Sequence, residues 1–140
     1  MDWNSIRAIR VLYMTLTDFE KHILELILAG DHHVLQSLRS QLGNCCVTNR
    51  EFTGCGFFTS LEVVPSESVA RIGSRRLHVG GVVAKIPGLK HGAGFILFVK
   101  NGYMCTLEGY TYNEQWPASF DSYELAYESG TRDIQSLDSD

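Results

Sequence analysis

Residues 92–112 read GAGFILFVKNGYMCTLEGYTY, two apolar runs that meet at Asn101-Gly102. An Asn-Gly pair between such runs is the strongest short signal for a β-hairpin with a two-residue turn. Such a turn fixes the pairing of the two strands, so we expect Phe95 to lie opposite Glu108. The sequence therefore predicts antiparallel strands over 92–100 and 103–112.

This pairing assigns the apolar side chains to two faces of the hairpin. Ile96 and Phe98 share one face with Leu107, and we expect helices to cover it. The second face carries four apolar side chains, Phe95, Leu97, Val99 and Met104. Leaving these four in water would cost about 6–12 kcal/mol, so something must cover them. We favour the C-terminal segment of the chain; a homodimer, another protein partner and a ligand pocket remain as alternatives.

Two helices are expected before the strands. Thr17 and Glu20 have the spacing of a capping box, which predicts a helix over 18–29. Asp31 is expected to cap a second helix over 32–42. Since only a short connection separates the two helices, they would form an N-terminal helical hairpin.

Further strand signals follow from residue 45 onward. Runs of β-branched and aromatic residues predict strands over 45–53, 57–64 and 77–86, with a polar loop over 65–76. One more short helix or strand is expected around 123–127. The sequence therefore predicts an α+β fold, with the N-terminal helical hairpin followed by an antiparallel β-meander of about five strands and with the helices on one sheet face.

The length of 140 residues fits one domain. We expect an N-terminal extension over 1–13, a single α+β domain over 14–128 and an acidic flexible tail over 129–140. The extension fits the rest of the sequence poorly, so the native chain starts either at Met14 or with a genuine N-terminal arm. From Glu114 onward the sequence holds seven acidic residues and one basic residue, a pattern typical of a solvated segment.

Composition argues against several functional classes. Twelve Lys plus Arg against sixteen Asp plus Glu give a formal net charge of −4, whereas nucleic-acid-binding domains usually carry a basic surface. No run approaches the roughly 18 apolar residues of a membrane helix. Arg7 and Arg10 interrupt the place where a secretory signal would be apolar. No Cys or His spacing matches a metal site. We therefore expect a cytoplasmic protein with reduced thiols, without a cofactor or metal, and without a nucleic-acid or membrane partner.

Polar and aromatic side chains gather near the open end of the predicted 92–112 hairpin. The candidates for binding are His91, Glu108, Tyr110, Tyr112 and Trp116. Carboxylate, imidazole and phenol groups close together suit acid–base chemistry or a small-ligand pocket. Cross-strand aromatic pairs that only stabilise the sheet are the alternative interpretation.

The preceding hairpin supplies two further candidates, Arg50 and Glu51. A three-residue loop would place Glu51 opposite Thr59 and Arg50 opposite Ser60. Arg50 is then expected to form a surface ion pair with Glu62, worth under about 1 kcal/mol. Binding of an anion by Arg50 is the functional alternative.

Several motifs carry a resemblance to known proteins: LTDFE at 16–20, REFTGCGFFT at 50–59, GAGFILFV at 92–99, LEGYTY at 107–112 and Trp116-Pro117. Together they resemble a family of small uncharacterised bacterial proteins of about this length. The resemblance covers the chain from Met14 to about Pro117. That family has no established activity, so the resemblance implies no catalytic residue.

These observations favour a binding module over an enzyme. We expect a small cytosolic bacterial protein that docks a protein partner through its acidic C-terminal region or its second sheet face. Immunity proteins, which neutralise toxins, share this architecture and are one form of that function. The alternative is a small-molecule-binding protein or small enzyme with a pocket on the second sheet face.

Overall fold

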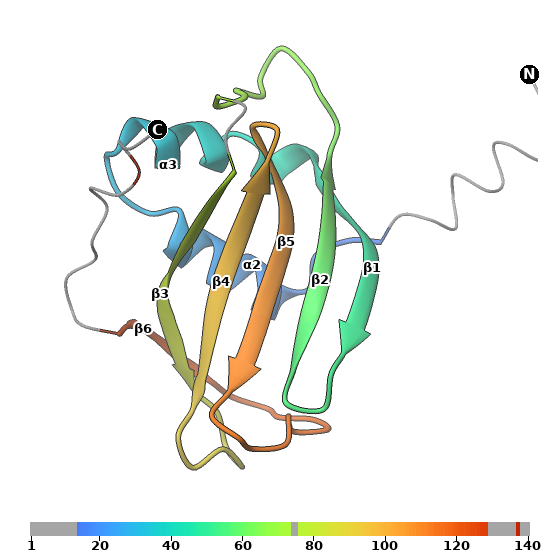
Figure 1. The fold of residues 1–140 in the computed structure, drawn as a ribbon, viewed down its shortest axis with the longest axis vertical. Helices are drawn as coiled ribbons and strands as arrows, with labels where there is room; N and C mark the ends of the chain where they lie inside the picture. Colours follow the sequence, from blue (N-terminus) through green and yellow to red (C-terminus); the bar gives the residue numbers. More distant parts are fainter. Residues whose placement is uncertain (1–13, 74–75, 129–136, 138–140) are drawn as a thin grey trace, which may run out of the picture.

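The computed structural model describes residues 14–73, 76–128 and 137, which form an α+β fold with a six-stranded antiparallel sheet and two helices (Figure 1). The helices are α2 (Asp18–Ile27) and α3 (His33–Arg39), followed by a short 3₁₀ helix, η1 (Leu42–Asn44). The strands are β1 (Cys45–Phe52), β2 (Gly56–Val63), β3 (Leu77–Lys85), β4 (Ala93–Lys100), β5 (Tyr103–Thr111) and β6 (Glu124–Tyr127). The expected extension over 1–13 lies outside the described residues, as does the expected tail apart from Leu137, which is buried.

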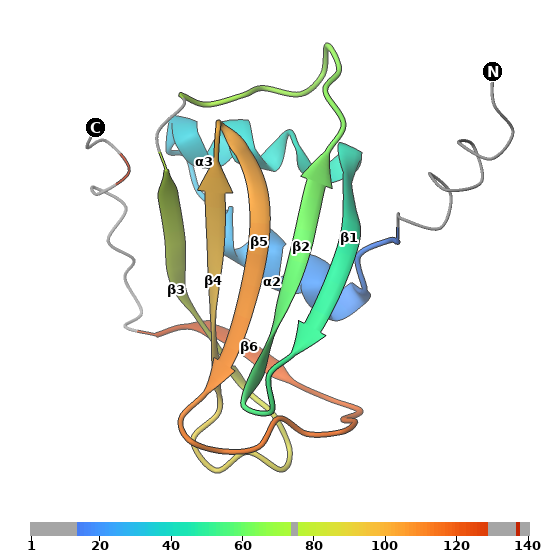
Figure 2. The same ribbon diagram turned by 45° about the vertical axis from the view of Figure 1, so that its right-hand side comes forward.

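The strands lie in the order β1-β2-β5-β4-β3-β6, and each pairs with its neighbours antiparallel. Strands β3, β4 and β5 form a meander, while the β1–β2 hairpin joins it through β2 and β5. To make this possible, the connection from β2 to β3 passes over one end of the sheet (Figure 2). The expected strands are therefore present, but their order is not that of a simple meander, and the short element around 123–127 is a sixth strand.

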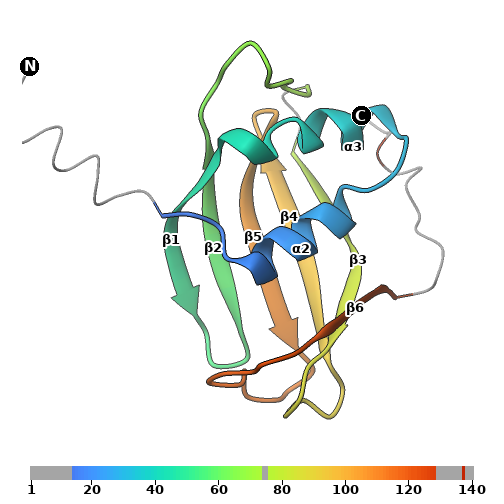
Figure 3. The ribbon, with the colours of Figure 1, turned by 180° about the vertical axis from the view of Figure 1, so that it is seen from behind.

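Both helices lie on the same side of the sheet (Figure 3). Helix α2 begins with the expected capping box, since Thr17 Oγ1 accepts from the Glu20 N–H at 3.1 Å and Glu20 Oε1 accepts from the Thr17 N–H at 2.8 Å. The N-cap of α3 is His32, whose Nδ1 accepts from the Val34 N–H, so the expected cap at Asp31 is wrong. The expected helical hairpin is not confirmed: α2 crosses the sheet face, whereas α3 lies near the end that holds the β4–β5 turn.

The core lies between α2 and the sheet. Side chains from the helix and from β4 meet there: Ile23, Leu24 and Ile27 from α2, and Phe95, Leu97 and Val99 from β4. The Phe19 ring meets the Phe95 ring edge-to-face, with 5.7 Å between their centroids. Cover of this face by the chain itself is thus confirmed, although α2 supplies it. The expectation that helices cover the opposite face was wrong.

The register of the β4–β5 hairpin changes at Cys105. Next to the turn Val99 lies opposite Met104 as expected, but the next pair is Phe98 with Thr106, which leaves Cys105 as an extra residue in β5. Such a β-bulge shifts all later pairs by one residue. Phe95 therefore lies opposite a glycine of β5, and the expected pairing with Glu108 is wrong.

The bulge also exchanges the two faces of β5. Leu107 points into the core and is fully buried, whereas the sequence placed it on the opposite face. Glu108 and Tyr110 point to the side that faces away from the helices. There Glu108 lies between Phe58 of β2 and Ile96 of β4. This local irregularity decides which side chains of β5 lie on the side away from the helices.

Candidate binding surface

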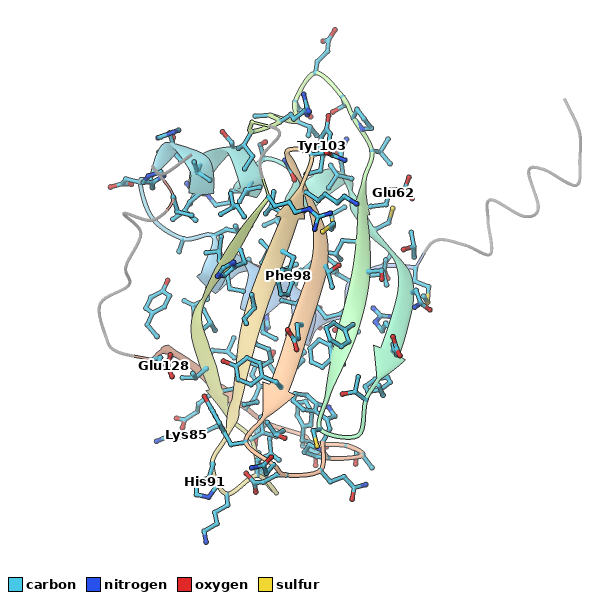
Figure 4. All side chains as sticks on the ribbon, viewed as in Figure 1. Glu62, Lys85, His91, Phe98, Tyr103 and Glu128 are labelled. Atoms are coloured by element: carbon cyan, nitrogen blue, oxygen red, sulfur yellow. The ribbon has the colours of Figure 1, made fainter. Side chains whose placement is uncertain are left out.

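The side of the sheet opposite the helices is not covered by any other described part of the chain (Figure 4). Its centre carries four half-buried apolar or aromatic side chains from three adjacent strands, Phe58 from β2, Ile96 and Phe98 from β4, and Tyr110 from β5. We call this side of the sheet the open face. Apolar and aromatic side chains that gather on one face and stay in contact with water are typical of interaction surfaces. The expected docking face of Phe95, Leu97, Val99 and Met104 is instead buried beneath α2, so a partner cannot contact it there.

Charge is divided unevenly over the open face. On β1, β2 and β5 the outward side chains include three carboxylates, those of Glu51, Glu62 and Glu108, and no Lys or Arg. The outward bases lie on the other half, with Lys85 on β3 and Lys100 on β4. One half of the open face is therefore negative, whereas the other half carries both signs of charge, since Glu124 of β6 lies opposite Lys85.

Tyr110 lies near the C-terminal end of β5, at the edge of the patch formed with Phe58, Ile96 and Phe98. Its ring lies over Gly94, where an added Cβ would come within 2.5 Å of the phenol carbon and oxygen. The Tyr110 ring also meets the Tyr112 ring edge-to-face, at 5.8 Å between centroids. Burial, the hydroxyl of Tyr112 and the carboxylates of Glu128 and Glu108 raise the pKa of Tyr110. The phenol therefore stays neutral and can both donate and accept a hydrogen bond.

Trp116, another expected site residue, packs against other aromatic rings. Its ring lies 5.2 Å from the Phe57 ring and 6.3 Å from the Phe120 ring, centroid to centroid. Its backbone N–H donates to the Gly54 carbonyl at 2.7 Å. The side chain thus joins the C-terminal segment to the β1–β2 hairpin and to the aromatic residues beside α2.

Arg50 forms an ion pair with Glu20 of α2. The prediction that it pairs with Glu62 is therefore wrong. Arg50 donates from Nη2 to Glu20 Oε1 at 2.7 Å and from Nε to Glu20 Oε2 at 3.0 Å. Thr59 Oγ1 donates to the same carboxylate at 2.7 Å, and so does the Thr17 N–H. Burial alone would raise the pKa of Glu20, but these hydrogen bonds outweigh it and lower that pKa. Because the Glu20 carboxylate already binds Arg50, Arg50 is not a free anion site.

Glu51 lies on the exposed outer side of β1. The β1–β2 register places it opposite Phe58 and places Arg50 opposite Thr59, one residue away from the expected pairing. The backbone N–H of Thr53 donates to the Gly56 carbonyl, so the turn is centred on Gly54-Cys55 rather than on the three residues assumed, which explains the shift. Glu51 belongs to the negative half of the open face.

A pocket of about 980 Å³ lies beside the lower edge of the open face. Its walls come from the end of β3 and the β3–β4 turn, from the segment 122–128 that contains β6, and from Tyr112. Of the expected site residues, His91 and Tyr112 line this pocket. Figure 4 shows Lys85, His91 and Glu128 along this edge of the sheet.

Glu114 fixes the β3–β4 turn at the mouth of the pocket. Its carboxylate accepts from the backbone N–H groups of Lys90 at 2.7 Å and His91 at 2.9 Å. These two hydrogen bonds lower the pKa of Glu114.

Four charged residues that line the pocket, Lys85, Lys90, Glu124 and Glu128, were not predicted from the sequence. The Pro87-Gly88 turn indicates only that the chain reverses, and nothing local shows that β6 returns to β3.

None of the family models, curated proteins or solved structures compared with the chain matches it. Among the described residues no helix is long and apolar enough to cross a membrane. The bacterial family indicated by the sequence motifs therefore stays a resemblance, and the case for function rests on the open face and the pocket beside it.

Proposed function

We propose that this protein is a binding module that docks a protein partner through the open face of its sheet. The observation that carries the proposal is the patch of Phe58, Ile96, Phe98 and Tyr110, which spans three strands and has no cover from the described chain. Aromatic side chains are enriched at the centres of protein interfaces, because they bury a large area with little loss of conformational freedom.

The charges around this patch favour a partner with a basic surface. Glu51, Glu62 and Glu108 line one half of the open face, and the chain as a whole carries a net charge of −4. Carboxylates on an interaction surface attract a basic partner and orient it as it approaches; here Glu108 lies within the patch, between Phe58 and Ile96, and Glu51 and Glu62 lie at its edge. Neutralisation of a toxin, as by an immunity protein, is one function of this kind.

Charge reversal on the open face tests the proposal. The affinity-tagged full chain, with Glu62→Lys and Glu108→Lys combined, is compared with the wild type for proteins retained from extracts of the source cells. A matched control combines Glu25→Lys and Asp31→Lys, two exposed acids on the helix side. Circular dichroism establishes that both variants are folded.

We expect a basic protein that the wild type and the control retain, that the open-face variant loses, and that salt releases. Phe98→Ser should weaken the same interaction without changing the net charge. An identical set of retained proteins for all variants would contradict the proposal.

A further inference from the structure

Glu108 lies within the apolar patch of the open face. Its position on β5 is opposite Phe58 of β2 on one side and opposite Ile96 of β4 on the other. Side chains at opposed positions have Cβ atoms about 4.5–5.5 Å apart, so the carboxylate has an apolar neighbour on each side. Along β5, side chains two residues apart share a face, which adds Thr106 and Tyr110. None of these four neighbours carries a charge.

The carboxylate of Glu108 has no partner within the described chain. It is partly exposed, and it forms neither an ion pair nor a hydrogen bond with another described residue. The outward base of β4, Lys100, stands four residues beyond Ile96, which is about 13 Å along the strand. The carboxylate of Glu20 beneath α2 is, by contrast, paired with Arg50. Glu108 is therefore available to a cationic group that comes from another molecule.

The neighbours of Glu108 suit a guanidinium group better than an ammonium group. A guanidinium is planar and weakly hydrated, so it packs on rings such as those of Phe58 and Tyr110, whereas an ammonium ion keeps its water. Two of its N–H groups match the two oxygens of a carboxylate, and the hydroxyl of Thr106 can accept from a third. An apolar group over Glu108 would exclude water and leave the carboxylate unpaired, which is unfavourable.

We infer that the protein partner places an arginine side chain on the patch, with its guanidinium group paired to Glu108. This inference rests on the proposed function, because it names the chemistry of the partner that docks there. Apolar residues beside that arginine lie on Ile96 and Phe98. Glu51 and Glu62, at the edge of the patch, attract a basic partner from a distance without contacting this side chain. Arginine is also among the residues that contribute most to affinity at the centre of an interface.

Capped pentapeptides test the inference by NMR titration of the ¹⁵N-labelled full chain. Each has the sequence acetyl-Gly-Leu-X-Leu-Gly-amide, in which X is arginine, lysine or citrulline; citrulline has the shape of arginine without its charge. We expect the arginine peptide to bind about two- to fivefold more tightly than the citrulline peptide, as for one partly exposed ion pair, and more tightly than the lysine peptide. The amide shifts should be largest around Phe58, Ile96 and Glu108.

A conservative substitution tests whether this preference comes from Glu108. In Glu108→Gln the arginine and citrulline peptides should bind equally well, because the amide keeps the shape of the side chain and removes its charge. The matched control is Glu62→Gln, which removes an outward charge at the edge of the same face and should keep the preference for arginine. The amide spectrum of each variant shows whether the fold is kept, and the comparison of the peptides on the wild type needs no substitution.

The inference fails if the arginine peptide causes no saturable shifts at millimolar concentration, or if the wild type binds all three peptides alike. It also fails if Glu62→Gln removes the preference for arginine as Glu108→Gln does, since the attraction would then belong to the whole face. Neither result decides whether a partner docks on the open face, because the loss of a retained protein with Phe98→Ser depends on the apolar patch. The two proposals can therefore fail separately.

Discussion

Glu20 is the residue on which the attachment of α2 most depends. Its side chain caps its own helix and also binds Arg50 of β1 and Thr59 of β2, so it joins three elements. It is only 4% exposed, and both of its carboxylate oxygens have donors. A buried carboxylate is tolerated when it is paired and fully hydrogen-bonded in this way.

Removal of this carboxylate should destabilise the protein strongly. We expect Glu20→Ala to lower the free energy of unfolding by about 3 kcal/mol, because it breaks the capping box and leaves Arg50 without its partner. Urea denaturation followed by circular dichroism measures the change. The control is Glu25→Ala on the exposed side of the same helix, which should stay within about 0.5 kcal/mol of the wild type. Equal effects of the two substitutions would show that the network adds no stability.

The same carboxylate makes stability depend on pH. The pKa of Glu20 is lowered from its ordinary value of 4.5, so the unfolded chain takes up a proton at higher pH than the folded chain. The stabilisation is therefore complete above about pH 4.5 and is lost as the pH falls through the lowered pKa. We expect the difference in unfolding free energy between the wild type and Glu20→Gln to shrink as the pH drops below 4.5. A difference that stays constant with pH would contradict this assignment.

At the scale of the elements, the sequence predicts the strands well and their contacts less well. Asn101-Gly102 places the β4–β5 turn correctly, because this dipeptide favours the turn conformation without help from distant contacts. The bulge at Cys105 has no comparable local signal. Beside it, the Met104 N–H donates to Oε1 of Gln41, a side chain more than sixty positions earlier in the chain. Reasoning from local patterns does not find a contact of this range.

The side chain of Gln41, just after α3, forms hydrogen bonds with the end of the sheet that holds the β4–β5 turn. Its side chain is fully buried, accepts from the Met104 N–H at 3.0 Å and donates to the carbonyls of Gly102 and Ala70, each at 2.9 Å. Gln41→Leu removes the side-chain partner of the Met104 N–H and of the Ala70 carbonyl, while the Gly102 carbonyl still accepts from the Ile72 N–H, so we expect it to lower the free energy of unfolding by about 1–3 kcal/mol. The matched control is Gln36→Leu, at an exposed position on α3. Amide hydrogen exchange should show faster exchange of the Met104 N–H in the first variant only, and unchanged exchange there would contradict the role of Gln41.

At the scale of the whole molecule, the position of the helices decides which face of the sheet stays open. The sequence predicts one group of candidates at the 92–112 hairpin, but the bulge sends Glu108 and Tyr110 to the open face, while His91 and Tyr112 line the pocket beside it. Trp116 packs against the core instead, and Arg50 forms an ion pair with Glu20 of α2. Amphipathic pattern alone could not decide which apolar face α2 covers, because both faces of β4 are apolar.

Substitutions at two neighbouring positions of β4 test which face of the sheet is covered. Leu97 is fully buried beneath α2, whereas Phe98 is half-buried on the open face. We expect Leu97→Ala to lower the free energy of unfolding by about 3 kcal/mol, since it leaves a cavity in the core. Phe98→Ala removes more atoms, yet it should cost only about 1 kcal/mol, because solvent already reaches that side chain. Urea denaturation of both variants gives the comparison. If Phe98→Ala proved the more damaging, the folded chain would cover the open face, and no partner could dock there.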